Sequence, residues 1–288
     1  MVETPTEQPS HADFVHASFE PQASFEPHAG FHWRIWAAEG AATFLLLLGG
    51  LSAACLDFGR GSPVEAVLPS HSARLLLTGL LFSACNSLLA ISPLGRLSGA
   101  HLNPAVTLSF HVLGRVGRHD VAGYLTAQLV GALAGAGALR LLWGGVAESI
   151  GGGVTKTTVS LPEAFALEVA MTGLLMAVIL VFVSSVRLAR WTPLALWPLI
   201  ALLVWGFADY TGTSLNPARS AGPAFVFGDT ASLWLYLLAP TAGALAVAFA
   251  WRGRHPGSQP KTAKLFHDAR YPCSFASELP AMAPDAPS

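Results

Sequence analysis

Six long apolar stretches run through the middle of the chain, and their lengths predict six membrane-spanning helices. The stretches lie at about residues 33–56, 72–92, 121–143, 161–186, 193–210 and 231–252. A helix needs about 20 predominantly apolar residues to cross a bilayer, and each stretch is long enough to do so, in some cases with a tilt. The pattern therefore predicts an all-α polytopic membrane protein.

Two shorter apolar runs interrupt this series, one after the second long stretch and one after the fifth. They cover about residues 105–113 and 218–227, roughly half of a bilayer span. Each begins at an Asn-Pro-Ala triplet, Asn103-Pro104-Ala105 in the first case and Asn216-Pro217-Ala218 in the second. Because Asn is a strong N-cap and Pro favours the first helical position, each triplet predicts the abrupt start of a helix. We expect two re-entrant half-helices.

The order of these elements predicts two related halves, at about residues 33–143 and 161–252. Each half has three spans, with a half-helix between the second and the third. An odd number of spans makes the second half enter the membrane from the opposite side, which produces an inverted repeat. Glu39 and Glu168 support this relation, since each is followed by Thr four residues later in the first span of its half. The half-helices should then point their N-termini at each other near the midplane of the membrane.

The composition agrees with a membrane protein and argues against several other classes. Hydrophobic residues make up 52% of the 288 residues and charged residues 11%, whereas a soluble domain has about 25% charged residues. A net charge of −1 gives no reason to expect nucleic-acid binding. The three cysteines, Cys55, Cys85 and Cys273, have the spacing of neither a zinc site nor a disulfide framework. We expect free thiols and neither a metal nor a cofactor.

Residues 1–32 and 253–288 differ in composition from the apolar middle of the chain. The first segment is rich in Pro, His, Ser and Glu, and the second is rich in Pro. Segments of this kind do not bury enough apolar surface to fold alone. We therefore expect disordered tails on either side of a membrane domain at residues 33–252. The first tail has no early positive cluster, so it does not predict a signal peptide.

Lys and Arg residues predict how the chain lies in the membrane, because they are enriched in cytoplasmic loops. If the N-terminus is cytoplasmic, the inner side holds the larger set: Arg34, Arg96, Arg115, Arg118, Arg187, Arg190, Arg252, Arg254, Lys261, Lys264 and Arg270. The outer side then holds Arg60, Arg74, Arg140, Lys156 and, within its re-entrant loop, Arg219. The excess favours both termini in the cytoplasm.

The meeting point of two such half-helices has a definite chemistry. The side-chain oxygen of each N-cap Asn accepts a backbone N–H, which leaves its amide free to donate to a neutral molecule. Each helix N-terminus also carries about half a positive charge, so the centre repels cations. A water molecule held by Asn103 and Asn216 would accept two hydrogen bonds and donate outward. This arrangement interrupts a proton wire but lets water pass.

The two triplets lie in matching contexts, after Ser98-Gly99-Ala100-His101 and after Thr211-Gly212-Thr213-Ser214. On these motifs the chain resembles the aquaporin, or major intrinsic protein, family, of bacterial type, over about residues 33–252. The resemblance implies the aquaporin-like fold of six transmembrane helices and two re-entrant half-helices, and a homotetramer with one pore in each subunit. It also implies a multi-pass protein of a plasma or inner membrane, with lipid, water and small neutral solutes as its partners.

The resemblance further implies which residues form a selectivity filter. Arg219 occupies the position of the family's filter arginine, which excludes cations and binds the permeant. Counted from the triplets as in the family, the other three positions fall on Ser83, Val204 and Thr213. Water-selective members have an aromatic residue at the first of these positions and a histidine at the second. Small Ser83 and apolar Val204 predict an atypically wide filter, unless a register shift of one residue places the ring of Phe82 or Trp205 there.

Three other residues are assigned by their positions in the family. Glu39 and Glu168 resemble its buried carboxylates, which accept hydrogen bonds from the backbone of the re-entrant loops. His101 resembles a residue whose backbone carbonyl lines the pore, and a role as a pH sensor is the alternative. For Arg219, a salt bridge to Asp209 is the alternative to a filter role.

Together these features predict a passive channel for water that excludes protons and ions. The alternative is an aquaglyceroporin-like facilitator of glycerol, urea or metalloid acids, which a wide filter would favour. An ion-coupled secondary transporter also uses inverted repeats and broken helices, but the sequence has no further acidic pair at the half-helix tips. An intramembrane enzyme finds no support, because the sequence has no His-Glu-x-x-His or Gly-x-Ser-x-Gly motif.

Overall fold

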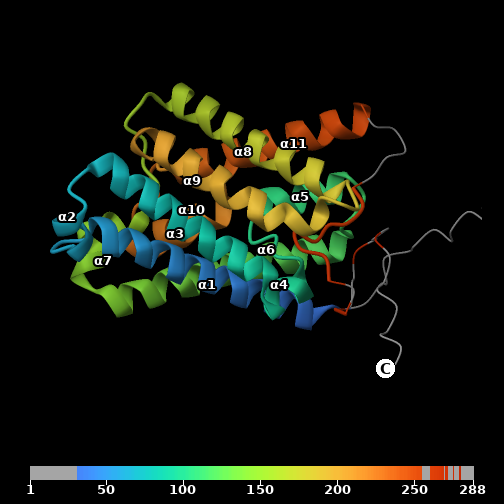
Figure 1. Cartoon of the computed structure of the whole chain (residues 1–288), viewed down its shortest axis with the longest axis horizontal. Helices are drawn as coiled ribbons and strands as arrows, with labels where there is room; N and C mark the ends of the chain where they lie inside the picture. The colour runs from blue at the N-terminus through green and yellow to red at the C-terminus, as the bar shows by residue number, and fades with distance from the viewer. Residues whose placement is uncertain (1–30, 255–259, 269, 272–274, 276–278, 280–288) are drawn as a thin grey trace, which may run out of the picture.

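The protein folds as an elongated bundle of helices (Figure 1). The structure, a computed structural model, describes residues 31–254, 260–268, 270, 271, 275 and 279. Within these residues, six helices are long and apolar enough to cross a membrane. They are α1 (Trp33–Phe58), α3 (His71–Ile91), α6 (Arg118–Trp143), α8 (Leu161–Val183), α9 (Thr192–Thr211) and α11 (Leu233–Arg254). The prediction of six spans in an all-α fold is confirmed, with boundaries that agree to within a few residues.

Two short helices occupy the predicted half-span positions. They are α5 (Pro104–Val112) and α10 (Pro217–Phe227). Each begins at an Asn whose Oδ1 accepts the backbone N–H two residues on, at 2.9 Å for both Asn103 and Asn216. The N-cap and the proline therefore start each helix as the triplet predicts. The remaining short elements are α2 (Pro63–Val67), α4 (Pro93–Ser98), α7 (Gly145–Ser149) and the 3-10 turns η1 (Gly151–Gly153) and η2 (Ala189–Trp191).

The two halves of the chain interlock through their half-helices. Helix α5 of the first half packs against α11 of the second, α10 of the second half packs against α6 of the first, and α5 and α10 touch each other. The approach of α10 to α6 depends on Gly222, where a Cβ would lie 2.5 Å from the backbone oxygen of Ala132. Small residues at such contacts let helix backbones come close in a membrane. The interlocked half-helices bring their N-terminal tips to the middle of the bundle.

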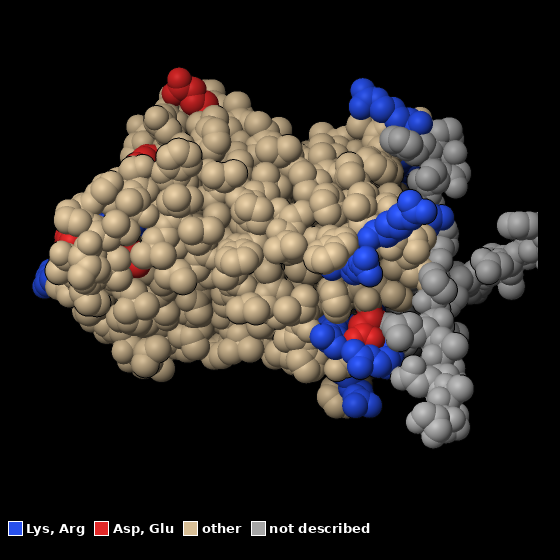
Figure 2. Space-filling model, in the orientation of Figure 1, with Lys and Arg blue, Asp and Glu red and all other residues tan. Residues whose placement is uncertain are grey.

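The ends of the bundle differ in charge. One end carries Trp33, where α1 begins, and Arg254, where α11 ends, and we call it the terminal face. The loops between α1 and α3 and between α6 and α8 lie at the other end, the opposite face. In the view of Figure 2, Lys and Arg side chains gather at the terminal face, and most of the visible Asp and Glu lie toward the opposite face. This asymmetry agrees with the charge pattern of the sequence.

Part of the C-terminal region is packed against the bundle. Helix α11 continues to Arg254, and residues 260–268 lie at the terminal face, where Ala263 and Lys264 have no exposed surface. The prediction of a disordered tail from residue 253 is therefore wrong for these residues, because contacts with the helices replace the core that the tail cannot form alone. The predicted N-terminal tail falls on residues 1–32, of which 1–30 lie outside the described residues.

Candidate pore

The tips of the two half-helices are joined by a reciprocal pair of hydrogen bonds. Asn103 Nδ2 donates to the backbone oxygen of Leu215 at 2.8 Å, and Asn216 Nδ2 donates to that of Leu102 at 2.6 Å. Each Asn therefore accepts a hydrogen bond from its own helix and donates one to the opposite loop. An Asn amide has two N–H groups, so this uses one of the two donors that the sequence predicts to be free. The second N–H of each remains available to a molecule at the tips.

The loops that lead to these tips have the same unusual backbone conformation. Ala100 and Leu102 have φ values of 54° and 52°, and Thr213 and Leu215 have values of 44° and 56°. These residues lie three positions and one position before each Asn. The left-handed region is unfavourable for residues other than Gly, and it persists only where the surroundings hold it in place. The inverted repeat therefore extends to the backbone of the loops.

Glu168 holds the second loop in this conformation. Its Oε1 accepts the backbone N–H of Ser214 and the Thr211 hydroxyl, both at 2.8 Å, and its Oε2 accepts the N–H of Leu215 at 3.0 Å. The carboxylate is buried on α8. Charge-assisted hydrogen bonds of this kind are the stronger ones in proteins. They satisfy backbone N–H groups that the loop cannot pair internally.

Glu39 has the equivalent place at the first loop. Its Oε1 accepts the backbone N–H of Leu102 at 2.5 Å and the side chain of Gln128, on α6, at 2.8 Å. Both carboxylates thus accept hydrogen bonds from the backbone of a re-entrant loop. The supporting bonds differ, because Glu39 uses one oxygen for both contacts whereas Glu168 uses two.

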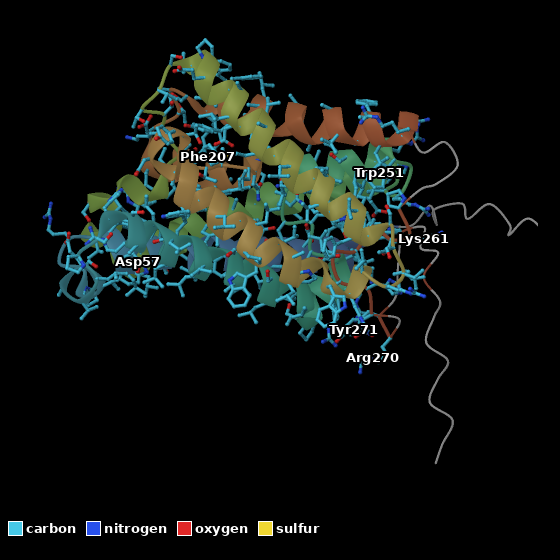
Figure 3. The ribbon with its side chains drawn as sticks, turned by 45° about the horizontal axis from the view of Figure 1, so that its top comes forward. Asp57, Phe207, Trp251, Lys261, Arg270 and Tyr271 are labelled. Carbon is cyan, nitrogen blue, oxygen red and sulfur yellow. The ribbon has the colours of Figure 1, made fainter. Side chains whose placement is uncertain are left out.

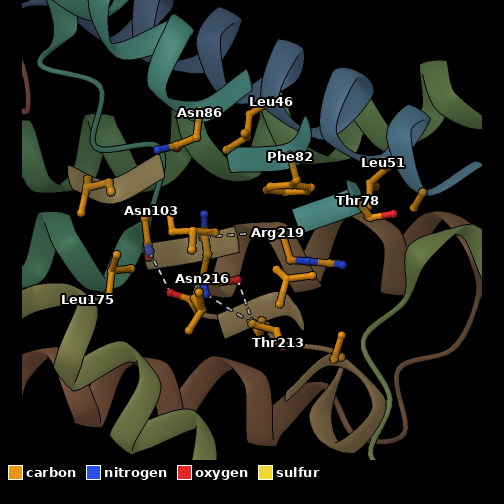
Figure 4. A pocket seen from close by; sticks show the side chains of 18 of the residues that line it. Leu46, Leu51, Thr78, Phe82, Asn86, Asn103, Leu175, Thr213, Asn216 and Arg219 are labelled. Atoms are coloured by element: carbon orange, nitrogen blue, oxygen red, sulfur yellow. Dashed lines mark hydrogen bonds between the residues drawn. The ribbon is translucent and has the colours of Figure 1, made fainter. Parts of the chain in front are cut away.

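A cavity of about 210 Å³ runs along the bundle past both half-helix tips. From the opposite face to the terminal face its wall includes Phe58, Leu75, Arg219, Asn103, Asn216, Leu196 and Leu265. In the close view of Figure 4, Leu46, Phe82 and Leu51 lie on one side of the cavity, and Arg219, Asn216 and Thr213 lie on the other. The side with Phe82 also carries the polar Thr78 and Asn86, and the side with Arg219 offers hydrogen-bond donors to the path.

Arg219 is held in the cavity wall by a loop of glycines. Its Nη1 donates to the backbone oxygen of Gly153 at 2.7 Å, and its guanidinium carbon lies 5.9 Å from the centre of the Phe82 ring. The alternative of a salt bridge to Asp209 is wrong, because the Asp209 carboxylate pairs with His71 at 2.9 Å. Arg219 therefore faces the cavity with donors to spare, since a guanidinium carries five N–H groups.

One predicted filter residue, Ser83, does not reach the cavity. Its side chain is fully buried, and its hydroxyl donates to the backbone oxygen of Gly79 at 2.6 Å within α3. The neighbouring Phe82 lines the cavity together with Thr78 and Asn86, at the spacing of four that places residues on one face of a helix. The prediction for Ser83 is corrected to Phe82, because consecutive helical residues point about 100° apart. Counting residues back from the first triplet did not determine which residue of α3 faces the cavity.

Three other residues that the sequence analysis names line the same cavity. Val204 and Thr213 line the cavity beside Arg219. His101 also lines it, and its ring is packed between aromatic side chains, with Phe110 stacked at 5.1 Å between ring centres. The His101 Nε2 lies 2.9 Å from the backbone oxygen of Ala263, in the C-terminal segment. That its backbone carbonyl lines the pore stays a prediction.

Gly153 and Leu265 are among the residues of the site that sequence reasoning missed. Gly153 ends a run of three glycines, Gly151-Gly152-Gly153, with φ values of 61°, 64° and 72°. Such a run signals a backbone conformation that other residues rarely adopt, and this was the signal that could have found it. Leu265 belongs to a short apolar and basic stretch within the Pro-rich tail, and nothing in that pattern indicates a position in the cavity.

Comparison with known proteins agrees with this geometry. Residues 27–251 match the family described as Major intrinsic protein. The chain belongs to the major intrinsic protein family. This is a family of channels rather than of enzymes, and the six spans make the chain a multi-pass membrane protein.

Individual relatives from this family match to different extents. The chain is 40% identical over 158 residues to Aquaporin NIP1-1 of Zea mays and to Nodulin-26 of Glycine max. These matches cover 54% of this chain and 55% and 58% of the relatives, so they span little more than half of those proteins. Aquaporin Z of Brucella melitensis biotype 1 is 33% identical over 227 residues, which cover 75% of this chain and 95% of that one.

A solved structure shares the fold. The aquaglyceroporin from Plasmodium falciparum matches with a TM-score of 0.63 over 76% of this chain and 94% of that one, at 23% sequence identity. At this identity the match establishes the arrangement of helices. The permeant is inferred from the residues of the pore.

Proposed function

We propose that this protein is a passive channel for water that excludes protons and ions. The observation that carries the proposal is the pair of asparagines, Asn103 and Asn216, on the wall of a cavity that passes both half-helix tips. A water oxygen there accepts from the remaining N–H of each amide, and its own protons point away along the cavity. Both half-helices direct their positive ends at this point, which disfavours cations.

The filter is formed by Phe82, Val204, Thr213 and Arg219. An aromatic ring opposite the arginine narrows the opening that Ser83 would have left wide, so water is the principal permeant. Val204 and the leucines that line the cavity favour a small neutral solute such as glycerol as the second candidate, since its carbon backbone can lie against them. Both candidate permeants would use the same path, and they differ only in the pore width that each needs at Phe82.

The proposal extends to the membrane and the assembly. Both termini lie in the cytoplasm, because the terminal face carries the excess of Lys and Arg (Figure 2). The channel domain comprises residues 33–252, and four copies assemble in a plasma or inner membrane as the family resemblance implies. Glu39 and Glu168 are structural in this proposal, since loop N–H groups occupy them. A transporter would need other carboxylates to couple ions.

The test is osmotic shrinkage of proteoliposomes followed by stopped-flow light scattering. We expect faster shrinkage than in empty vesicles, with a low activation energy, and no dependence on an ion gradient. The Arg219→Val variant should admit cations, whereas Arg60→Val, at an exposed arginine outside the cavity, should not. Shrinkage no faster than in empty vesicles, with folded protein in the membrane, would refute the channel. Collapse of transport on dissipating a gradient would favour the transporter.

A further inference from the structure

The C-terminal segment, residues 260–268, lies across the terminal end of the cavity. Its backbone is fixed at two places, since Lys261 N donates to the oxygen of Val183 and Leu265 N donates to the oxygen of Gly99, both at 2.9 Å. Val183 ends α8, and Gly99 begins the first re-entrant loop. The segment therefore bridges the helix ends that surround the mouth of the pore. Figure 3 shows Lys261 beside the helix ends at this face.

The middle of the segment is inserted rather than laid on the surface. Ala263 and Lys264 have no exposed surface, and 3% of Leu265 is exposed. The Leu265 side chain is part of the cavity wall at its terminal end. The buried ammonium of Lys264 donates to the backbone oxygen of Arg96 at 2.7 Å, which offsets part of the cost of taking a charge out of water.

The segment occupies hydrogen-bonding groups that belong to the pore. The Gly99 oxygen accepts from Leu265, and His101 Nε2 pairs with the Ala263 oxygen at 2.9 Å. Phe275, farther along the chain, stacks on the His101 ring at 5.4 Å between ring centres. Gly99 and His101 belong to the loop that leads to Asn103. Groups that would otherwise meet water in an open passage are therefore paired with the chain's own C-terminal residues.

Charged contacts hold the segment from outside the cavity. Asp268 accepts from Arg96 Nη1, on α4, at 2.9 Å, and from Arg270 Nη2 at 2.8 Å. The Arg96 guanidinium also lies over the Phe266 ring, 5.4 Å from its centre. Partly exposed pairs of this kind are weak one by one. Such weak pairs suit a contact between the segment and the bundle that can form and break.

We propose that residues 260–268 are an autoinhibitory plug that closes the terminal end of the pore. Leu265 fills the passage, the backbone bonds to Gly99 and His101 set its depth, and the Arg96–Asp268 pair latches it. The plug rests on the proposed channel function. Water flow is then set by the fraction of molecules in which the segment is undocked.

The test compares the full chain with a chain that ends at Arg254, both in proteoliposomes and normalised to the amount of folded protein. If about a tenth of the full-length molecules are undocked, truncation should raise water permeability about tenfold. A synthetic peptide of residues 255–288, added to the terminal face of the truncated channel, should lower it again. The same peptide with Leu265 replaced by Asp is the control and should have no effect.

A point variant keeps the test decisive if truncation impairs folding. Leu265→Ala removes the side chain from the cavity but retains the backbone bond to Gly99, and it should also raise permeability. Tyr271→Ala, in the same region but outside the cavity wall, is the matched control and should not. Equal permeability of the full chain, the folded truncation and Leu265→Ala would overturn the plug and leave the channel intact. Failure of all three to conduct water would overturn the channel itself and the plug with it.

Discussion

Gly50 of α1 leaves the space that the ring of Phe82 fills. A Cβ at Gly50 would lie 2.5 Å from two carbons of that ring, a distance that requires the ring to move. On its other side the ring faces Arg219, whose guanidinium carbon is 5.9 Å from the ring centre. The ring is therefore held between Gly50 of α1 and the arginine of the proposed filter. Gly50 sets how far the ring extends into the passage.

Replacing this glycine should narrow the pore. In Gly50→Ala the added methyl group pushes Phe82 toward Arg219, so we expect water permeability to fall severalfold. Gly206→Ala is the control, because it makes the same change in α9 at a position with open space around it. Stopped-flow shrinkage of proteoliposomes measures both. Equal permeability of the two variants would show that the ring does not limit the flow.

The ring should also decide which solutes pass. Phe82→Ala widens the opening opposite Arg219, so we expect glycerol uptake to rise well above that of the unmodified channel. Ser83→Ala should leave uptake unchanged, because the hydroxyl bonds within α3 and does not reach the cavity. Uptake of labelled glycerol by proteoliposomes distinguishes the two. A rise in glycerol uptake in Ser83→Ala but not in Phe82→Ala would show that Ser83 faces the pore, as the sequence predicts.

The two buried carboxylates should respond differently to neutralisation. Glu168→Gln places an NH2 where one oxygen now accepts a backbone N–H, and a buried group left unpaired costs about 1–3 kcal/mol. Glu39→Gln should cost less, because the oxygen that accepts from Leu102 and Gln128 can be kept as the amide oxygen. Thermal unfolding in detergent should therefore show the lower Tm for Glu168→Gln. The reverse order would contradict the assigned hydrogen bonds.

Mild acid should release the plug. Burial lowers the pKa of His267 below its ordinary value, and the positive charge of Lys264 lowers it further. Docking therefore favours the neutral ring: the stabilisation is complete above about pH 6.5, the ordinary pKa of histidine, and is lost as the pH falls toward the lowered value. We expect water permeability of the full chain to rise between pH 7.5 and pH 5.5.

Other charged groups near the plug should not produce this change. They are Lys261, Lys264, Asp268 and Arg270 in the C-terminal region, Arg96 on α4 and His101 in the first loop. Hydrogen bonds from Arg270, and the nearby charge of Arg96, hold the pKa of Asp268 below its usual range, so its latch is lost only in stronger acid. His267→Gln should abolish the rise. Persistence of the rise in that variant would assign it to another group, such as His101.

The sequence by itself determined the number of spans, the half-helices and the inverted repeat. Span lengths follow from the thickness of the bilayer, and the Asn-Pro start of each half-helix follows from N-capping, so both are local properties of the chain. Glu39 and Glu168 recur at equivalent positions in the two halves, and their contact with the loops was expected from the resemblance to the family.

Only the tertiary structure decided which side chains meet in the pore. Ser83 and Phe82 are one residue apart, and their difference of about 100° around α3 depends on how that helix packs against α1 at Gly50. The contact of Arg219 with Gly153 joins the second half-helix to the connection between the two halves of the chain. Leu265 lies in the cavity wall because its backbone N–H binds the oxygen of Gly99 at the terminal face. A Pro-rich segment has no periodicity that encodes such a partner, so its place is a property of the folded molecule.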